Sequence, residues 1–292
     1  MEKAKVLVAG ATGYLGKYVI EALHREGYRI RALVRNAERL GEVKALCDEI
    51  VVAEATKPET LAELIGDATV VFSSLGKHDF KRKPTVLDVD YQANMNILQR
   101  AIEAKVEHFV FISALHSEQL KSKGVKLSQA RESVVEALQA SGLNWTVLRP
   151  TGFFNDMADF FNMAVKGTGW VAGSGYSRMN PIHGADLADK VVQCIADPDA
   201  RNKAFNVGGP DVLTQREMYG LAFGVLKKEM KVRRIPLWML PPMSKLLGLF
   251  IPMAGDALHY LYYLVKWEGL APACGTHHLK DYYQELARTT NT

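Results

Sequence analysis

The sequence predicts an α/β fold, with a doubly wound parallel sheet in the first half of the chain and a smaller lobe in the second half. Short apolar runs without polar alternation are typical of strands that are buried on both faces, and hence of a parallel sheet covered by helices. From residue 5 to about residue 151 these runs alternate with segments of helical period. That alternation is the sequence pattern of a doubly wound sheet.

Each element of the first half can be assigned in order along the chain. Strands are expected at residues 5–9, 29–34, 49–52, 69–73, 109–112 and 145–148. Helical segments are expected between them at residues 16–26, 37–46, 58–64, 86–104 and 129–140. Six strands with helical crossovers are enough for one nucleotide-binding type of sheet.

Beyond Pro150 the pattern becomes less regular. The expected elements are, in order, a glycine-rich loop at 167–175, a helix at 185–195, a strand at 204–207, a helix from Thr214 to about residue 228, a proline-broken apolar stretch at 235–265, and a polar tail that ends at 279–287. Thr214 is a residue type that caps helix N-termini. We expect two domains, 1–151 and 152–292, the second packed on the carboxyl end of the sheet as a substrate lobe with some return to the sheet.

Composition excludes several classes of protein. The chain has 292 residues with 48% hydrophobic and 23% charged residues, as in an ordinary globular protein. A net charge of +4, spread along the chain, does not indicate nucleic-acid binding, which usually shows a clustered basic stripe. The three cysteines have neither disulfide nor metal spacing. With no secretory signal expected at the N-terminus, these features predict a cytoplasmic protein.

The apolar stretch at 235–265 does not predict a membrane span. A span needs about 18 apolar residues without charges, and Lys245 and Asp256 interrupt this stretch. Two interpretations stay open: a packed core or subunit interface, or the wall of a large hydrophobic pocket or a peripheral contact with a membrane surface. Both a monomer and a homodimer agree with the sequence.

The strongest motif lies directly after the first expected strand. Gly10, Gly13 and Gly16 follow that strand and open the first helix, which is the context that a phosphate-binding glycine turn requires. Gly10 would allow a tight turn, Gly13 a close approach to a pyrophosphate, and Gly16 close packing of helix on strand. The motif predicts a bound dinucleotide; the alternative is a glycine-rich turn with no ligand.

The end of the second strand indicates which dinucleotide is bound. NAD-preferring sites place a carboxylate at this position, but residues 31–36 contain no acidic residue. Arg35 stands there instead, with Arg31 and Arg39 nearby. An arginine fork suits a 2′-phosphate. We therefore expect NADP(H) rather than NAD(H). The alternative is that Arg35 is a solvated residue at the start of a helix.

Several further segments resemble a known family over nearly the whole chain. The spacing Gly-x-x-Gly-x-x-Gly resembles the extended and atypical short-chain dehydrogenase/reductases, and the segments that carry the resemblance further are 54–56, 73–76, 90–94, 109–114, 148–154 and 181–188. Together they look like an atypical short-chain dehydrogenase/reductase of the NmrA-like type. The tail at 271–283 is most similar to the divinyl chlorophyllide 8-vinyl reductase branch.

The resemblance implies a set of site residues. For cofactor binding they are Gly10, Thr12, Gly13, Tyr14, Leu15, Gly16, Arg35, Glu54, Ala55, Ser74, Leu75, Gly76, Ser113, Arg131, Pro150 and Phe153. Ser113 and Arg131 are also the candidate catalytic residues; Ser113 ends the fifth strand, where it could equally be a capping hydroxyl. No metal is expected, because Cys274, His277 and His278 lack a nearby fourth ligand.

The chain departs from the family at its catalytic signature. Leu127 stands at the tyrosine position of Tyr-x-x-x-Lys and Arg131 at the lysine position. Leucine cannot donate a proton, and arginine does not deprotonate near neutral pH. The resemblance then implies one of two functions. The first is a reductase of a conjugated hydrophobic small molecule, whose double bond can be reduced without a proton donor from the protein. The second is a non-catalytic NADP(H)-binding redox sensor, regulator or assembly factor.

Overall fold

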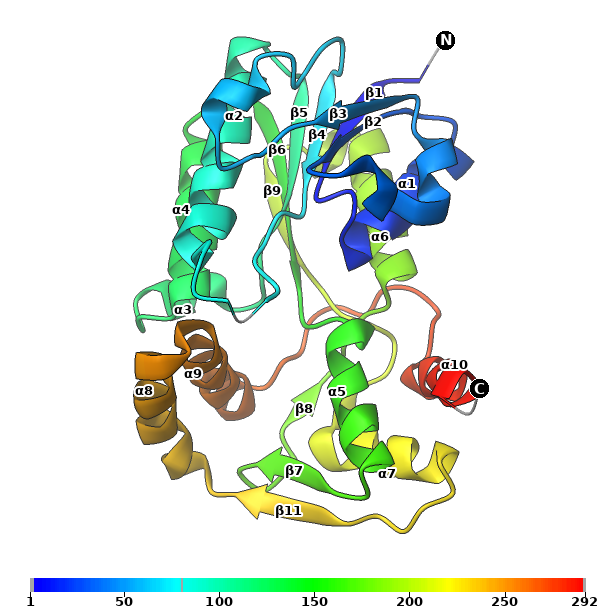
Figure 1. Ribbon diagram of the computed structural model, residues 1–292, viewed down its shortest axis with the longest axis vertical. Helices are drawn as coiled ribbons and strands as arrows, with labels where there is room; N and C mark the ends of the chain where they lie inside the picture. Colours follow the sequence, from blue (N-terminus) through cyan, green and yellow to red (C-terminus); the bar gives the residue numbers. More distant parts are fainter. Residues whose placement is uncertain (1–2, 80, 291–292) are drawn as a thin grey trace. The chain divides into compact units, whose positions relative to one another are not determined.

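The computed structural model describes residues 3–79 and 81–290, and the chain divides into two compact units (Figure 1). Unit 1 comprises Met1–Arg149 and Leu187–Phe205. Unit 2 comprises Pro150–Asp186 and Asn206–Thr292. The second half of the chain therefore supplies part of unit 1.

Unit 1 is built on a seven-stranded sheet with the order β3-β2-β1-β4-β5-β6-β9. Its strands are β1 (Lys5–Ala9), β2 (Arg29–Val34), β3 (Glu49–Val52), β4 (Val70–Ser73), β5 (His108–Ile112), β6 (Asn144–Pro150) and β9 (Lys203–Val207). All pairs from β3 to β6 are parallel. The strand order reverses beside β1, so the predicted doubly wound sheet is confirmed.

Helices cover both faces of this sheet: α1 and α6 lie on one face, and α2 and α4 on the other (Figure 1). The helical segments are α1 (Tyr14–Arg25), η1 (Ala37–Leu46), η2 (Pro58–Leu61), η3 (Leu87–Ala93), α2 (Asn94–Glu103), α3 (Ser117–Lys121), α4 (Lys126–Gln139), α6 (Gly184–Ala196) and η4 (Pro198–Ala200). Apolar residues of the strands and of α2 and α4 form one buried cluster. This cluster is the core between the sheet and the helices α2 and α4.

Two expected helices of unit 1 differ in detail. The segment η1 is a 3-10 helix with a kink at Gly41, whose φ of +61° is outside the helical range. The expected helix at 86–104 begins with π-helical turns in η3 and becomes α-helical in α2. Asp90, within η3, and Asn94, the first residue of α2, are both fully buried. Two polar side chains of this helical segment therefore lie inside the unit.

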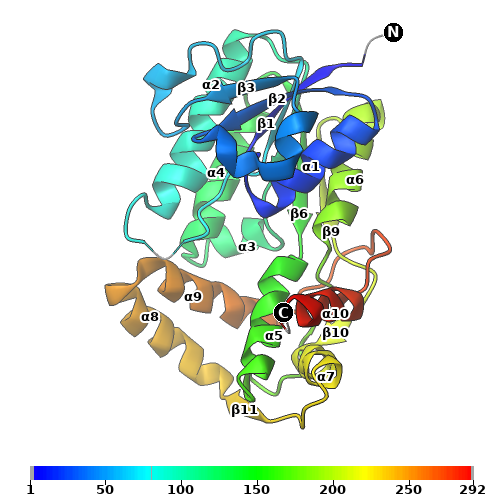
Figure 2. The ribbon, with the colours of Figure 1, turned by 45° about the vertical axis from the view of Figure 1, so that its right-hand side comes forward.

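Unit 2 packs three helices around its own core. Its elements are α5 (Phe154–Val165), β7 (Gly169–Ala172), β8 (Arg178–Met179), β10 (Leu213–Thr214), α7 (Gln215–Val225), β11 (Val232–Ile235), η5 (Leu237–Met239), α8 (Leu240–Phe250), α9 (Pro252–Trp267) and α10 (Leu279–Thr290). Helices α5, α7 and α10 lie side by side (Figure 2) and bury aromatic residues between them. The expected cap is confirmed: Thr214 Oγ1 accepts a hydrogen bond from the Glu217 N–H at 3.2 Å.

The expectation of a loop at 167–175 is wrong. Residues Gly169–Ala172 form β7, which pairs in parallel with β11. A Cβ on Gly169 would stand 2.5 Å from the ring of Tyr219. The glycine is therefore required by close packing of a strand against α7 rather than by a turn, and composition does not distinguish these two causes.

Prolines begin helices in the apolar stretch instead of excluding them. Pro241 and Pro242 lie in the first turn of α8, and Pro252 is the first residue of α9. The first turn tolerates proline because its N–H groups have no partner within the helix. Among the described residues, no helix is long and apolar enough to cross a membrane.

Candidate functional site

A glycine turn connects β1 to α1. Gly10 has a φ of +89°, a left-handed conformation that is open to glycine because it has no Cβ. A Cβ on Gly16 would stand 2.1 Å from the carbonyl oxygen of Gly10. Gly13 is the N-cap of α1, and no described side chain caps that end of the helix. The turn therefore leaves the positive end of the helix available to an anionic group.

A second loop, residues 74–76, follows β4 and lies against the glycine turn. The Ser74 N–H donates to the Ala9 carbonyl at 3.1 Å, and a Cβ on Gly10 would stand 2.7 Å from Ser74 Oγ. The order of strands reverses between β1 and β4. In doubly wound sheets, ligands bind in the crevice beside such a reversal.

Asn94 holds the second loop from inside, although it is not among the residues that the sequence predicts for the site. Its side-chain amide donates to the carbonyls of Leu75 at 3.3 Å and Asp90 at 2.9 Å. Its Oδ1 accepts a hydrogen bond from Ser73 Oγ at 2.6 Å. The signal available in the sequence is an asparagine four residues after an aspartate on a helix face that also carries Ile97. A polar residue on an otherwise apolar helix face indicates a buried polar group with a specific role.

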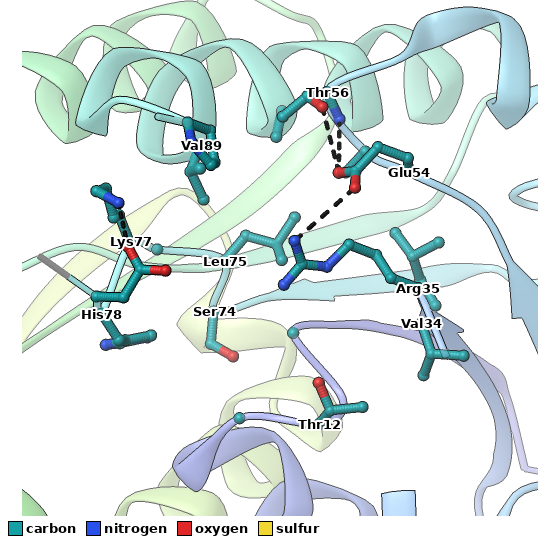
Figure 3. A pocket seen from close by; sticks show the side chains of 18 of the residues that line it. Thr12, Val34, Arg35, Glu54, Thr56, Ser74, Leu75, Lys77, His78 and Val89 are labelled. Carbon is teal, nitrogen blue, oxygen red and sulfur yellow. Dashed lines mark hydrogen bonds and ion pairs between the residues drawn. The ribbon is translucent and has the colours of Figure 1, made fainter. Parts of the chain in front are cut away.

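The ends of β2 and β3 bring Arg35 and Glu54 together (Figure 3). Arg35 Nη1 lies 3.8 Å from Glu54 Oε2, and the arginine side chain is 60% exposed. Glu54 Oε1 accepts a hydrogen bond from the Thr56 hydroxyl at 3.2 Å. An exposed pair at this distance contributes little to stability. The Arg35 guanidinium is therefore only loosely held and can be recruited by a stronger anion.

These loops line one cavity of about 780 Å³, a volume typical of ligand pockets. Nine of the predicted cofactor residues line it: Gly10, Thr12, Gly13, Arg35, Glu54, Ala55, Ser74, Leu75 and Gly76. Among the described residues, its charged lining comprises Arg35, Arg39, Lys77, Lys81 and Lys83 against Glu54 and Asp79. An excess of positive charge favours a polyanionic ligand.

Arg131, on α4, lies directly behind Gly76. Its Nε donates to Asp90 Oδ1 at 3.0 Å, and its Nη1 donates to the Ser113 carbonyl at 3.1 Å. The other carboxylate oxygen of Asp90 accepts the Lys77 N–H at 3.0 Å. A Cβ on Gly76 would stand 2.5 Å from Arg131 Nη2. Glycine at this position thus leaves room for the guanidinium behind the loop, although Arg131 itself is not among the residues that line the cavity.

Ser113, at the end of β5, belongs to a buried charged network. Its hydroxyl donates to Glu132 Oε1 at 2.6 Å. Arg149 Nη2 donates to Glu132 Oε2 at 2.8 Å and to Glu118 Oε1 at 2.9 Å. The sequence prediction does not include Glu132. Its helical spacing from the buried Val135 is the signal that places it on the inner face of α4.

The other predicted residues lie elsewhere. Residues 14–16 form the first turn of α1, where they could contribute backbone N–H groups. Pro150 and Phe153 belong to unit 2 and are not among the residues that line this cavity. Leu127, at the expected tyrosine position, is half-buried in the first turn of α4.

The histidines of the tail pair with carboxylates. His277 Nδ1 lies 2.7 Å from Asp186 Oδ1, and His278 Nδ1 lies 2.8 Å from Asp211 Oδ1. The Asp211 carboxylate raises the pKa of His278 through this hydrogen bond. No group of three or more His, Cys, Asp or Glu side chains within the described ranges is arranged to hold a metal ion.

A family model described as NAD(P)H-binding matches residues 10–198. The chain belongs to this NAD(P)H-binding family. The matched part contains the glycine turn, the loop after β4 and Arg131. The predicted nicotinamide dinucleotide is confirmed at the level of the family, and the residues present fit it, because the glycine turn, the uncapped helix end and the cationic wall all suit a pyrophosphate and its ribose phosphates.

Curated relatives in this NAD(P)H-binding family include both an enzyme and an assembly factor. The chain is 31% identical over 265 residues to the chloroplastic divinyl chlorophyllide a 8-vinyl-reductase of Zea mays, covering 82% of this chain and 66% of the relative, just under two thirds of its length. It is 26% identical over 250 residues to the photosystem II assembly factor Ycf39 of Trieres chinensis, covering 84% of this chain and 76% of the relative. The predicted resemblance is thereby confirmed.

Solved structures of similar fold include both reductases and nucleotide-sugar epimerases. The NADPH-dependent quinone oxidoreductase of Escherichia coli, in complex with NADPH, has a TM-score of 0.77 at 19% identity and covers 97% of this chain and 99% of its own. The Citrobacter triphenylmethane reductase, in complex with NADP(H), has a TM-score of 0.75 at 18% identity with the same coverage. At this identity the likeness establishes the fold.

Proposed function

We propose that this member of the NAD(P)H-binding family is an NADP(H)-dependent reductase of a conjugated hydrophobic small molecule. The observation that carries the proposal is Arg35 on the wall of the cavity that the glycine turn opens. No acid stands at the end of β2 to repel a 2′-phosphate, and the loose contact with Glu54 leaves the guanidinium able to turn to one. Both of these features favour NADP(H) over NAD(H).

Different segments of the chain would bind different parts of the dinucleotide. The glycine turn and the first turn of α1 would bind the pyrophosphate through backbone N–H groups. Glu54 and Ala55 would lie by the adenine, and the loop at 74–76 would follow the cofactor toward Arg131. When bound, the reduced nicotinamide supplies a hydride. Ser113 is proposed to lie near the nicotinamide and to present its oxygen as an acceptor, because its proton is donated to Glu132.

Leu127 and Arg131 favour reduction of a double bond over reduction of a carbonyl. Carbonyl reduction by the usual route needs a tyrosine to protonate the oxygen, and leucine has no proton to give. The fixed charge of Arg131, anchored on Asp90, can stabilise negative charge that spreads through a conjugated substrate, while water or the substrate supplies the proton. The maize relative, whose name describes a vinyl reductase, supports the same choice.

The first test is a titration of the purified protein with NADPH and with NADH, followed by nicotinamide fluorescence. We expect tight binding of NADPH and much weaker binding of NADH. Equal affinities would contradict the role of Arg35, and binding of neither would contradict the cofactor assignment itself. Conjugated apolar acceptors would then be screened for NADPH oxidation.

The second candidate function is a non-catalytic NADP(H)-binding sensor, regulator or assembly factor. It is favoured by the loss of both the tyrosine and the lysine of the signature, and by the relative named as a photosystem II assembly factor. Hydride transfer distinguishes the two. A sensor binds the oxidised and reduced cofactor but does not pass hydride from deuterated NADPH to any acceptor, which mass spectrometry of the products would detect.

We also infer a reducing compartment, with the cytoplasm as our expectation. Cys47, Cys194 and Cys274 all lie within the described residues and form no disulfide. Monomer and homodimer are both retained for the proposed enzyme, and sedimentation velocity would distinguish them.

A further inference from the structure

Helices α8 and α9 form a hairpin that packs mainly against itself (Figure 2). A Cβ on Gly255 would stand 2.5 Å from the Cα of Gly248, so the two backbones are in direct contact where the helices cross. The Ser244 hydroxyl donates to the Gly255 carbonyl at 2.7 Å and ties the crossing together. A change to side chains on the outside of this hairpin should therefore leave its geometry intact.

The hairpin and its entry turn expose several bulky apolar side chains. Among its described residues, Leu240, Ser244 and Gly255 are buried. The exposed apolar residues of the hairpin and its entry turn, which we call the apolar ridge, are Trp238, Leu246, Leu249, Phe250 and Ile251. Trp238 is 73% exposed and Leu249 is 72% exposed. Leu246, Leu249 and Phe250 have the spacing i, i+3, i+4 and so share one face of α8.

Positive charge accompanies the apolar ridge. Between residues 227 and 251 the chain has six cationic residues and one acidic residue, Glu229. Lys231 pairs with Glu229 at 3.6 Å, and Arg233 lies over the Trp170 ring at 5.6 Å. Arg234, on β11, and Lys245, next to Leu246 on α8, are exposed. The segment thus combines bulky apolar groups with a local excess of cations.

We infer that the apolar ridge docks on an anionic lipid surface as a peripheral contact. Apolar side chains enter the boundary between headgroups and acyl chains, and neighbouring cations attract anionic headgroups. Tryptophan is enriched at this depth of a bilayer. A second copy of the chain fits less well, since a two-fold contact would bring the same cations of both copies together. The inference does not depend on the proposed reductase activity.

The test is co-sedimentation of the whole protein with vesicles. The protein should pellet with an equimolar mixture of phosphatidylcholine and phosphatidylglycerol, and high salt should release much of it. The double variant Leu249→Ser, Phe250→Ser should lower the partition coefficient at least about ten-fold, because two large apolar groups no longer enter the lipid. The variants Arg234→Glu and Lys245→Glu should each lower it by about five-fold or more.

Matched controls distinguish this contact from nonspecific electrostatic and hydrophobic binding to vesicles. Val212→Ser removes an exposed apolar residue of unit 2 outside the ridge, and Lys123→Glu reverses an exposed charge in unit 1; both should pellet like the unchanged protein. Every variant should bind NADPH as the unchanged protein does, which shows that it is folded.

Three outcomes would overturn the inference. One is no pelleting with anionic vesicles. Another is equal pelleting of the ridge variants and their controls. The third is a protein that does not bind vesicles but self-associates, with the self-association abolished in the Leu249→Ser, Phe250→Ser variant. That result would make the ridge an interface between copies.

Discussion

The guanidinium of Arg131 and the carboxylate of Asp90 form an ion pair of 3.0 Å behind Gly76, where Asp90 is fully buried. The same carboxylate accepts the Lys77 N–H. The loop after β4 and the guanidinium of Arg131 are therefore both held by one side chain. Through Asp90, the wall of the cavity is linked to α4.

Replacing Asp90 by asparagine should destabilise the protein by about 3 kcal/mol, because Arg131 would keep its charge without its partner. The two carboxylate oxygens of Asp90 accept hydrogen bonds from Arg131 Nε and from the Lys77 N–H. In the asparagine variant the amide nitrogen would replace one of these oxygens and would face a donor. Urea unfolding measures the loss. In a double-mutant cycle with Arg131→Met, the two losses should be less than additive; strict additivity would show that the pair is not coupled.

Gly16→Ala should reduce stability by roughly 1–3 kcal/mol and weaken NADPH binding, since the new methyl group would collide with the Gly10 carbonyl. The matched control is Gly220→Ala in α7, where a Cβ would meet nothing within 4 Å. That change should instead stabilise by about 0.5–1 kcal/mol through helix propensity. Urea unfolding and nicotinamide fluorescence measure both effects; equal responses of the two variants would refute a close approach at Gly16.

Arg35→Ala should raise the dissociation constant of NADPH roughly 10- to 100-fold, the loss expected for a charged hydrogen bond to phosphate. Affinity for NADH, which lacks the 2′-phosphate, should stay within about two-fold. Lys57→Ala removes an exposed cation that does not line the cavity and should change neither affinity. A parallel loss for both cofactors would mean that Arg35 acts on the fold or on a shared part of the dinucleotide.

Acid should weaken unit 2 through His183. Burial, together with the neighbouring His277, lowers the pKa of His183 to about 4. The folded state therefore keeps this imidazole neutral while the unfolded chain, with a pKa near 6.5, takes up a proton. Its contribution to stability is present above that unfolded value and is lost as the pH falls toward the folded value. Between about pH 7 and about pH 5 the loss should be about 2 kcal/mol.

The variant His183→Asn isolates this effect, because an amide can still accept the Ala185 N–H that His183 Nδ1 accepts at 3.2 Å but does not titrate. Chemical unfolding at both pH values should show a flatter pH dependence for the variant. Identical slopes would assign the acid sensitivity to carboxylates elsewhere in the chain.

Much of unit 1 could be predicted because its signals are local. The strands at 5–9, 29–34 and 49–52 were predicted with their observed bounds, since uninterrupted apolar runs between turns leave little choice of register. The glycine turn has a local signature as well. Its three glycines are required by the φ of Gly10 and by contacts within the same turn.

The site is less predictable, because its polar anchors act over long separations. Asn94 supports a loop that precedes it by about twenty residues, and Glu132 meets Ser113 and Arg149 from the next helix. Each is an isolated polar residue in an apolar pattern. Such a residue indicates that a partner exists without identifying it.

The sequence by itself determined the sheet, the glycine turn and the expected cofactor class, because periodicity and turn chemistry depend on neighbours along the chain. Only the tertiary structure decided that Gly169 belongs to a strand, where the ring of Tyr219 fills the space of a side chain. It also decided that Arg131 meets Asp90, 41 residues away. These contacts are set by the packing of distant elements, which a local pattern does not contain.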